Sequence, residues 1–227
     1  MFPIGDDGKI EKKPVVNFSL IFINLALFVY SIIYGLESSI RNFGLVPIDI
    51  LSGRRIYTLF TSTFMHGGFL HIAGNMLYLY IFGDNVENRL GHWKYLLLYI
   101  ISGIGADFLH ILMLRSPQEY LVPAVGASGA ISGVLGAFLI LCPRVRVKVI
   151  VFTWILMIIP VRAHIFIAFW FVYQLLMSLS GLVGLGGGIA WFAHIGGFIT
   201  GFSLAKLYEM WEGKYAPKRR RLLILYR

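Results

Sequence analysis

The feature that most constrains this chain is a series of long apolar segments separated by short polar ones. The first runs from about Val15 to Leu36, and a helix of roughly 20 such residues crosses the hydrocarbon core of a bilayer. It is too long for the apolar region of a signal peptide, and no small-residue cleavage site follows it. Alternating barrel-type segments are absent, so helices are the expected way to satisfy the backbone in lipid.

The composition supports a membrane protein over an unusually apolar soluble domain. Hydrophobic residues make up 58% of the chain and charged residues only 14%, whereas soluble domains carry roughly 25% charged residues. The single cysteine, Cys142, excludes an intramolecular disulfide and a cluster of cysteine ligands. No cofactor is expected, and the spacing and depth of His66, His71 and His194 do not favour a metal site.

Six spans can be drawn, which predicts an all-α membrane protein built as a six-transmembrane-helix bundle over residues 15–208. A cytoplasmic segment, 1–14, precedes the bundle, and a basic cytoplasmic tail, 209–227, follows it. Pro160 and Arg162 divide the long apolar run 149–180 into an interfacial part and the fifth span. The expected spans cover about 15–36, 67–83, 93–114, 126–142, 161–180 and 190–208. The 37–66 connection is expected to lie in the outer interface, and 181–188 is a short flexible connection.

The distribution of Lys and Arg predicts the orientation, because cytoplasmic loops carry an excess of these residues. Sixteen of the 20 fall in the N-terminal segment, the 84–94 loop, the 143–162 region and the tail. The other side receives four, namely Arg41, Arg54, Arg55 and Arg115. Both termini are therefore expected in the cytoplasm, and an even number of spans agrees with this. The membrane is expected to be the plasma membrane. The net charge of +9 indicates topology and anionic lipid rather than a nucleic-acid partner.

Polar residues inside apolar spans are functional candidates by default. His71 and Asn75 lie early in the second span, Ser128 begins the fourth, and His194 lies a few residues into the sixth. Even-numbered spans run from outside to inside in the expected orientation, so all four side chains should share the outer half of the membrane. His71 and Asn75 are four residues apart and share one helix face.

Two glycine patterns explain how these helices can come close. Gly126, Gly129, Gly133 and Gly136 form one smooth face of the fourth span, and Gly197 and Gly201 form a small-xxx-small face beside His194. Such faces let helix backbones pack tightly in lipid. Close packing is what a short serine side chain needs to reach a histidine on another helix.

The chemistry that fits this layer is nucleophilic acyl transfer. His194 would take the proton of Ser128 and later protonate the leaving amine. His71, Asn75 and the main-chain N–H groups at Ser128 could stabilise the oxyanion. No acidic residue is placed as an obvious third member, since Asp107 lies in no recognisable motif and is expected to be structural, like His110. The sequence therefore favours a Ser–His dyad.

At this point the sequence resembles the rhomboid family of intramembrane serine proteases. The matching segments are HGGFLHIAGNM (66–76), GDNVENRLG (83–91), GASG (126–129) and AHIGGFITG (193–201), and they cover essentially the whole membrane core. The resemblance implies Ser128 as nucleophile, His194 as base, and His71 with Asn75 as oxyanion residues. It implies that Gly126 and Gly129 belong to the nucleophile motif, that Glu87 is structural, and that His66 is not catalytic.

Two departures from the family pattern leave questions open. Tyr57 and Thr58 stand where family members often carry Trp-Arg, which affects the first outer loop. Ser132 stands one turn after the serine, where many members have an aromatic residue. Its hydroxyl could bond the second ring nitrogen of His194, or it could bond back to its own helix.

The resemblance implies an intramembrane endopeptidase that cleaves transmembrane segments of membrane proteins. Its partners would be transmembrane substrates and the lipid bilayer. The alternative is a non-catalytic rhomboid-like binder of transmembrane helices, which loss of the serine or histidine would mark. A small transporter is a third possibility and would predict inverted repeats. An α/β-hydrolase is disfavoured, because the serine lies in G-A-S-G-A rather than G-x-S-x-G.

Overall fold

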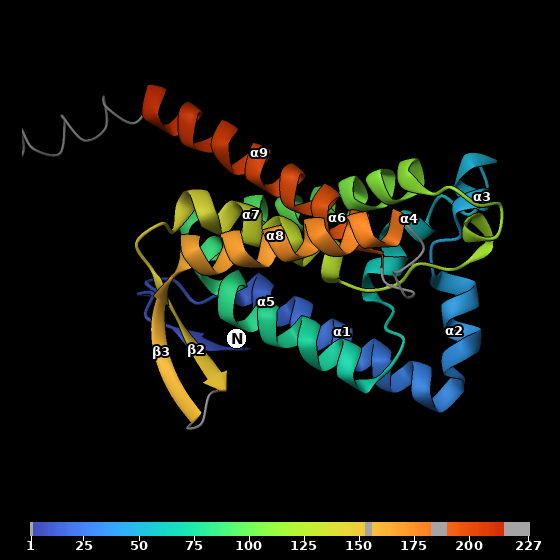
Figure 1. Ribbon diagram of the computed structural model, residues 1–227, viewed down its shortest axis with the longest axis horizontal. Coiled ribbons are helices and arrows are strands. Elements are labelled where there is room, and N and C mark those ends of the chain that lie inside the picture. Colours follow the sequence, from blue (N-terminus) through green and yellow to red (C-terminus); the bar gives the residue numbers. More distant parts are fainter. Residues whose placement is uncertain (1, 153–155, 183–189, 216–227) are drawn as a thin grey trace, which may run out of the picture.

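The computed structural model describes residues 2–152, 156–182 and 190–215 and consists of a helical bundle with a small sheet at one end (Figure 1). Its long helices are α1 (Val15–Tyr34), α5 (Phe69–Leu90), α6 (His92–Met113), α7 (Ser128–Leu141), α8 (Ala163–Leu182) and α9 (Trp191–Tyr215). Shorter turns of helix are α2 (Leu36–Phe43), α3 (Pro47–Leu51), α4 (Thr58–Thr61), η1 (Ser62–Phe64) and η2 (Glu119–Leu121).

The expected helical bundle is confirmed, while the count of six crossings stays a prediction. Over the described ranges, α1, α6 and residues 163–180 of α8 are long and apolar enough to cross a membrane. The apolar helix α7 has only 14 residues. The helices lie close to the expected spans, but α5 and α9 continue well beyond residues 83 and 208.

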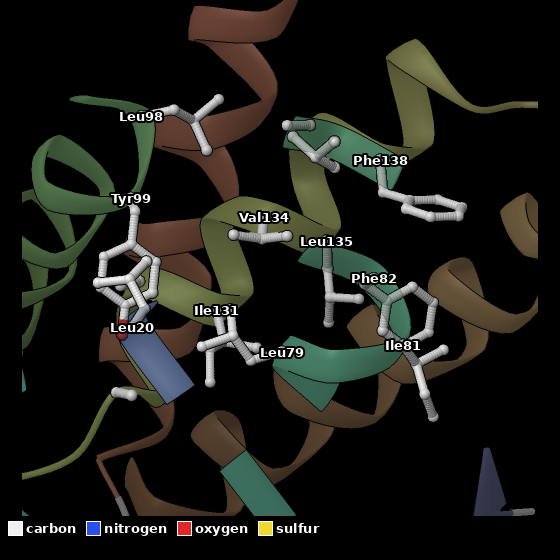
Figure 2. Close-up of a cluster of buried hydrophobic side chains, with 14 of the residues drawn as sticks. Leu20, Leu79, Ile81, Phe82, Leu98, Tyr99, Ile131, Val134, Leu135 and Phe138 are labelled. Carbon is white, nitrogen blue, oxygen red and sulfur yellow. The ribbon is translucent and has the colours of Figure 1, made fainter. Parts of the chain in front are cut away.

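Helix α7 is the centre of the bundle (Figure 2). Every residue from Gly129 to Phe138 is buried, and Leu79 of α5 and Tyr99 of α6 pack beside it in the core. An α-helix that is apolar on all sides is stable only when it is enclosed. The short, glycine-rich fourth segment therefore serves as the core around which the longer helices pack.

Helices α7 and α9 approach one another through glycine. A Cβ atom added at Gly197 would overlap the main-chain carbonyl of Gly129, and one added at Gly201 would overlap the carbonyl of Gly133. Backbone cannot move aside as the end of a flexible side chain can. The two glycine patterns thus face each other, one on each helix, as small-residue faces do in membrane bundles.

Polar groups also hold the start of α1 in place. The buried carboxylate of Glu87 accepts hydrogen bonds from the N–H groups of Val16 (3.0 Å) and Asn17 (2.7 Å). These belong to the first turn of α1, whose N–H groups have no partner within the helix. The side chain of Asn17 donates to the carbonyl of Leu79 (3.1 Å) and accepts from the hydroxyl of Tyr95 (2.7 Å). Glu87 therefore joins α5 to α1, in keeping with the structural role expected of it.

The sheet is an addition to the all-α fold that the sequence analysis missed. Strands β1 (Phe2–Asp6), β2 (Arg146–Phe152) and β3 (Leu156–Arg162) pair antiparallel in the order β1-β2-β3. The run 149–160 is thus largely strand, and α8 begins at Ala163. Pro160 lies in β3, an edge strand, where a missing N–H is tolerated.

The two ends of the bundle carry different structures (Figure 1). The sheet, with the N-terminal strand, lies at one end, and α2 and α3 lie at the other. The carboxyl end of α9 also points toward the sheet end. Both ends of the described chain therefore lie at one end of the bundle, as the expected orientation requires.

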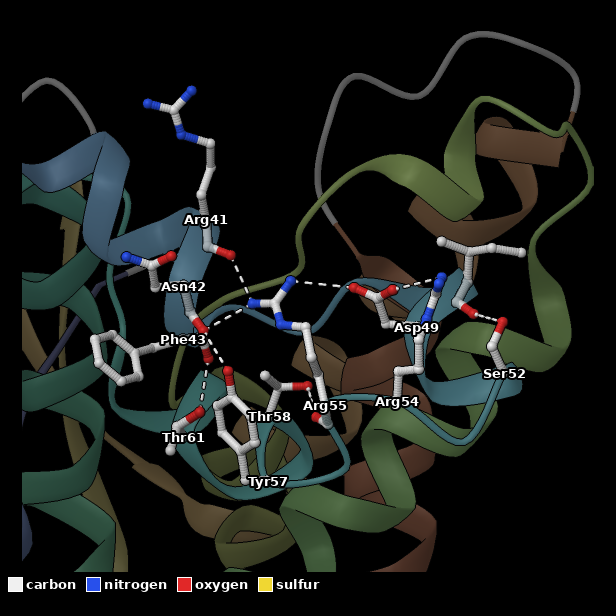
Figure 3. Close-up of polar contacts among 11 residues, drawn as sticks. Arg41, Asn42, Phe43, Asp49, Ser52, Arg54, Arg55, Tyr57, Thr58 and Thr61 are labelled. Atoms are coloured by element: carbon white, nitrogen blue, oxygen red, sulfur yellow. Dashed lines mark hydrogen bonds and ion pairs between the residues drawn. The ribbon is translucent and has the colours of Figure 1, made fainter.

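The connection between α1 and α5 is ordered by Arg55 (Figure 3). Its guanidinium donates to Asp49 (3.1 Å) and to the main-chain carbonyls of Arg41 (2.6 Å) and Asn42 (2.7 Å). The hydroxyl of Tyr57 donates to the same Asn42 carbonyl (3.1 Å). Arg55 and Tyr57 thus fix this loop in a chain that lacks the Trp-Arg pair of the resembling family.

Candidate active site

Ser128 is the first residue of α7, and a strained turn presents it. Gly126 has φ +127°, a conformation that favours glycine because other residues meet a steric penalty there. Its N–H donates to the carbonyl of Ser62 (3.0 Å). Leu45 and Ala124 exchange two main-chain hydrogen bonds (2.9 and 2.8 Å). The turn before Ser128 is therefore pinned to the loop that Arg55 orders.

The hydroxyl of Ser128 meets His194 across the α7–α9 contact. The Oγ–Nε2 distance is 2.9 Å, within the range of a nucleophile and its general base. The residues come from helices that start 63 positions apart in the chain. The glycine contact described above is what brings these backbones close enough for a serine side chain to span the gap.

The other ring nitrogen of His194 meets Gln174 of α8. The distance from Nδ1 to Oε1 is 2.8 Å, and Gln174 is buried. The rings of Trp170 of α8 and Trp191 of α9 lie beside His194, with centroids 6.4 and 6.0 Å from that of its ring. Sequence reasoning missed Gln174, although a glutamine inside an apolar span is itself a signal.

His71 and Asn75 lie beside the turn that precedes Ser128. A Cβ atom at Gly126 would sit 2.8 Å from Nε2 of His71 and 3.7 Å from Nδ2 of Asn75. The N–H of Gly67 donates to Nδ1 of His71 (3.4 Å), which leaves the hydrogen on Nε2. The amide nitrogen of Asn75 is buried without a partner among the described residues. Both groups are thus free N–H donors facing this turn.

The start of α7 supplies a further donor. The first hydrogen bond of the helix runs from the N–H of Ile131 to the carbonyl of Ala127. The N–H groups of the residues before Ile131 therefore have no partner within the helix. The N–H of Ser128 is one of them, and it lies beside the hydroxyl that would react. His71, Asn75 and this N–H together can bind a developing oxyanion.

A small cavity of about 30 Å³ reaches Ser128 from the side of α6. Asp107 and Ser62 are among its lining residues, and Oδ2 of Asp107 is buried without a hydrogen-bond partner in the part of the chain described. A space of this size can hold about two water molecules, next to the atom that hydrolysis would involve.

Two further sequence candidates take no direct part in the Ser128–His194 contact. His66 is buried and packs edge-on against His71, with ring centroids 5.2 Å apart. Burial, helped by the neighbouring His71, lowers the pKa of His66 to about 4, so this ring is neutral at physiological pH. Ser132 donates its hydroxyl hydrogen to its own helix, which is the second of the two possibilities that the sequence left open.

Comparison with known proteins places this geometry in context. Residues 53–210 match the Rhomboid domain family. The chain is 34% identical over 171 residues to RHOMBOID-like protein 4 of Arabidopsis thaliana, covering 71% of this chain and 36% of that protein. It is 30% identical over 217 residues to Rhomboid protease AarA of Providencia stuartii, covering 85% of this chain and 72% of that protein.

A mitochondrial relative also matches most of the chain. Rhomboid protein 1 of Saccharomyces cerevisiae is 28% identical over 204 residues, covering 89% of this chain and 55% of that protein. The chain spans between about a third and a half of the length of the Arabidopsis thaliana relatives numbered 4, 6 and 1. The family match over residues 53–210 includes Ser128, His194 and the residues around them.

Proposed function

The chain belongs to the rhomboid family, and we propose that it is an intramembrane serine endopeptidase that cleaves transmembrane segments of membrane proteins with a Ser–His pair. The single observation that carries the proposal is the 2.9 Å contact between Ser128 Oγ and His194 Nε2. A non-catalytic member that only binds transmembrane helices would have no need of this contact. The name of the Providencia stuartii relative, a protease, supports the same reaction.

The reaction follows from the positions of the two side chains. Oγ of Ser128 attacks the carbonyl carbon of the substrate while its proton moves to Nε2 of His194. The C–N bond then breaks, and His194 returns the proton to the leaving amine. A water molecule deprotonated by His194 hydrolyses the ester on Ser128 and restores the hydroxyl. No cofactor takes part in any step.

Charge develops on the substrate oxygen in both halves of the reaction. The N–H donors of His71, Asn75 and Ser128 converge on the turn at Gly126 and would bind this oxyanion. Donors fixed in advance, away from bulk water, stabilise such charge strongly. The aromatic rings of Trp170 and Trp191 lie beside His194, with centroids 6.4 and 6.0 Å from its ring.

The setting of the site points to a substrate held in the bilayer. Ser128 lies at the end of α7 that contacts the 37–66 connection. The side expected to carry most of the Lys and Arg residues lies at the other end. We place the protein in the plasma membrane with both termini in the cytoplasm, although two of its relatives are named mitochondrial. The partners are transmembrane proteins and lipid, and no nucleic acid.

The test uses purified protein in detergent or liposomes with a panel of transmembrane substrates and a fluorophosphonate probe. The wild type should cleave a substrate and label at Ser128, and Ser128→Ala should do neither while keeping its thermal stability. Ser178→Ala is the control, because its buried hydroxyl bonds only its own helix, to the carbonyl of Leu175. Cleavage by Ser128→Ala would refute the mechanism, and substrate binding without cleavage or labelling by the wild type would favour the non-catalytic binder.

A further inference from the structure

We propose that Gln174 is a positioning residue that fixes the protonation pattern of His194, so that the site works as a Ser–His–Gln arrangement rather than as a pair. The inference rests on the proposed function. It starts from one geometric fact: both ring nitrogens of His194 are occupied, Nε2 by Ser128 Oγ at 2.9 Å and Nδ1 by Gln174 Oε1 at 2.8 Å.

The chemistry of the amide oxygen decides which nitrogen carries hydrogen. An amide oxygen can only accept a hydrogen bond, so Nδ1 must be the protonated nitrogen in neutral His194. Nε2 is then left with a lone pair that faces the hydroxyl of Ser128. This is the tautomer that a general base requires, and the second partner of a histidine commonly sets it. Free histidine prefers the opposite tautomer, which would leave Ser128 without a base.

Gln174 is held rigidly enough to perform this role. It lies on the face of α8 that also carries Ile167, Trp170 and Ser178, at the 3- and 4-residue spacing of one helix face. Gln174 is 4% exposed, Ile167 is 0% exposed and Ser178 is 2% exposed. A glutamine fixed by packing pays little additional ordering entropy when it accepts the hydrogen bond. Its oxygen is therefore in place before substrate arrives.

An uncharged third residue also fits a site inside a membrane. Among the described residues, no carboxylate bonds to His194. His71 and His110 are titratable groups that influence its charge, and Asp107 lines the cavity beside Ser128 and keeps its place in every Gln174 variant. A buried carboxylate in lipid carries a large desolvation cost. Glutamine fixes the tautomer without that cost, but it stabilises the imidazolium of the transition state less than a carboxylate would.

Kinetics of three variants separate positioning from packing. Gln174→Met keeps the size of the side chain and removes the acceptor, so kcat should fall roughly 10- to 100-fold with KM within about twofold. Gln174→Glu keeps an acceptor and should retain roughly tenfold more activity than Gln174→Met. Ser178→Ala removes a buried hydroxyl one turn away and should behave as the wild type. All four proteins are compared at equal folded fraction.

The pH profile adds a readout that a packing role would not move. A carboxylate at position 174 favours the imidazolium, so the acid limb of kcat/KM should lie at higher pH in Gln174→Glu than in the wild type. His71 and His110 are unchanged in this comparison and cannot produce the difference. The proposal would be overturned if Gln174→Met had wild-type kcat and KM, or if Gln174→Met and Gln174→Glu lost the same fraction of kcat. It would also be overturned if the acid limb of kcat/KM lay at the same pH in Gln174→Glu and the wild type.

A spectroscopic measurement keeps the inference separate from the proposed function. In protein labelled with ¹⁵N-histidine, the His194 signals, assigned with His194→Ala, should report hydrogen on Nδ1 in the wild type and increased hydrogen on Nε2 in Gln174→Met. This result would support the positioning role even if no substrate were cleaved, which would refute only the protease function. Hydrogen on Nε2 in the wild type would overturn the role of Gln174 whatever the activity.

Discussion

The hydroxyl of Ser132 donates a hydrogen bond to the main-chain carbonyl of Ser128, 2.7 Å away, one turn earlier in α7. Its single hydrogen is therefore used within its own helix, and Nδ1 of His194 is bonded to Gln174 instead. Of the two contacts that the sequence left open for the Ser132 hydroxyl, the structure contains the one within its own helix and not the one with His194. Back-bonding of this kind is common for serine inside a helix.

Ser132→Ala should therefore leave the rate of cleavage within about twofold of the wild type, because removing one additional donor from a main-chain carbonyl costs little free energy. The measurement is kcat and KM on one transmembrane substrate, beside Gln174→Met as the variant expected to lose activity. A tenfold loss in Ser132→Ala with intact stability would mean that this hydroxyl supports His194 after all.

Asn75→Ala tests the oxyanion assignment. The amide nitrogen of Asn75 is buried and has no partner in the described part of the chain. It lies near Gly126, so its hydrogen bond should form only when the oxyanion appears. Loss of one such donor lowers kcat by roughly 100- to 1,000-fold in other enzymes. We expect kcat to fall far more than KM rises. An effect confined to KM would instead assign Asn75 to substrate binding.

The sequence indicated which polar side chains share one layer of the bundle, but it did not indicate the contact between His194 and Gln174. Depth in the expected spans was enough to bring Ser128, His194, His71 and Asn75 into one layer, because helix direction and residue number fix depth. Gln174 could not be paired with His194 in this way. Which face of α8 turns inward depends on packing, and α8 begins only after a sheet that the sequence analysis did not anticipate.

Two strands of the sheet, β2 and β3, were missed because they overlap the run 149–180, which is apolar enough to be assigned to the membrane and its interface. From Arg146 to Val149, exposed basic residues alternate with valines, and Val147 and Val149 are fully buried. That period of two is the strand signal. The third strand, β1, comes from the N-terminal segment, and its pairing across more than 140 residues leaves no local trace in the sequence.

Gly201→Ala tests whether the close contact of α7 and α9 supports catalysis. The new Cβ atom would overlap the carbonyl of Gly133, so the helices must separate. Overpacking of this kind costs roughly 1–3 kcal/mol. Because His194 lies on the same helix, the separation should also lengthen its contact with Ser128 and reduce cleavage at least tenfold.

A matched control for this variant lies on the same helix. Gly213 is also in α9, and a Cβ atom there would meet nothing within 4 Å. Gly213→Ala should be neutral or stabilise the protein by up to about 1 kcal/mol, since alanine favours helix over glycine. Thermal unfolding and cleavage are measured for both. Equal behaviour of the two variants would show that the α7–α9 contact tolerates a methyl group.

Glu87→Ala should destabilise the bundle without removing any reacting group. The carboxylate is 1% exposed and accepts the N–H groups of Val16 and Asn17, which would be left unpaired. Such a loss costs roughly 1–3 kcal/mol, measured by unfolding in detergent. The control is Glu209→Ala, whose ion pair with Lys206 is half exposed and worth roughly 0–1 kcal/mol. Equal stability of the two variants would contradict the capping role.

The orientation in the membrane can be tested with single cysteines. Ser52 lies in the 37–66 connection, which is expected outside, and Arg144 lies just before β2 of the sheet; both are exposed. In a Cys142→Ala background, a membrane-impermeant maleimide should label Ser52→Cys in intact cells and Arg144→Cys only after permeabilisation.

The physical reason is the excess of Lys and Arg at the sheet end. At the opposite end, Arg54 and Arg55 are paired with Asp49, which sharpens the bias further. Labelling of Arg144→Cys alone in intact cells would reverse the topology and place Ser128 toward the cytoplasm.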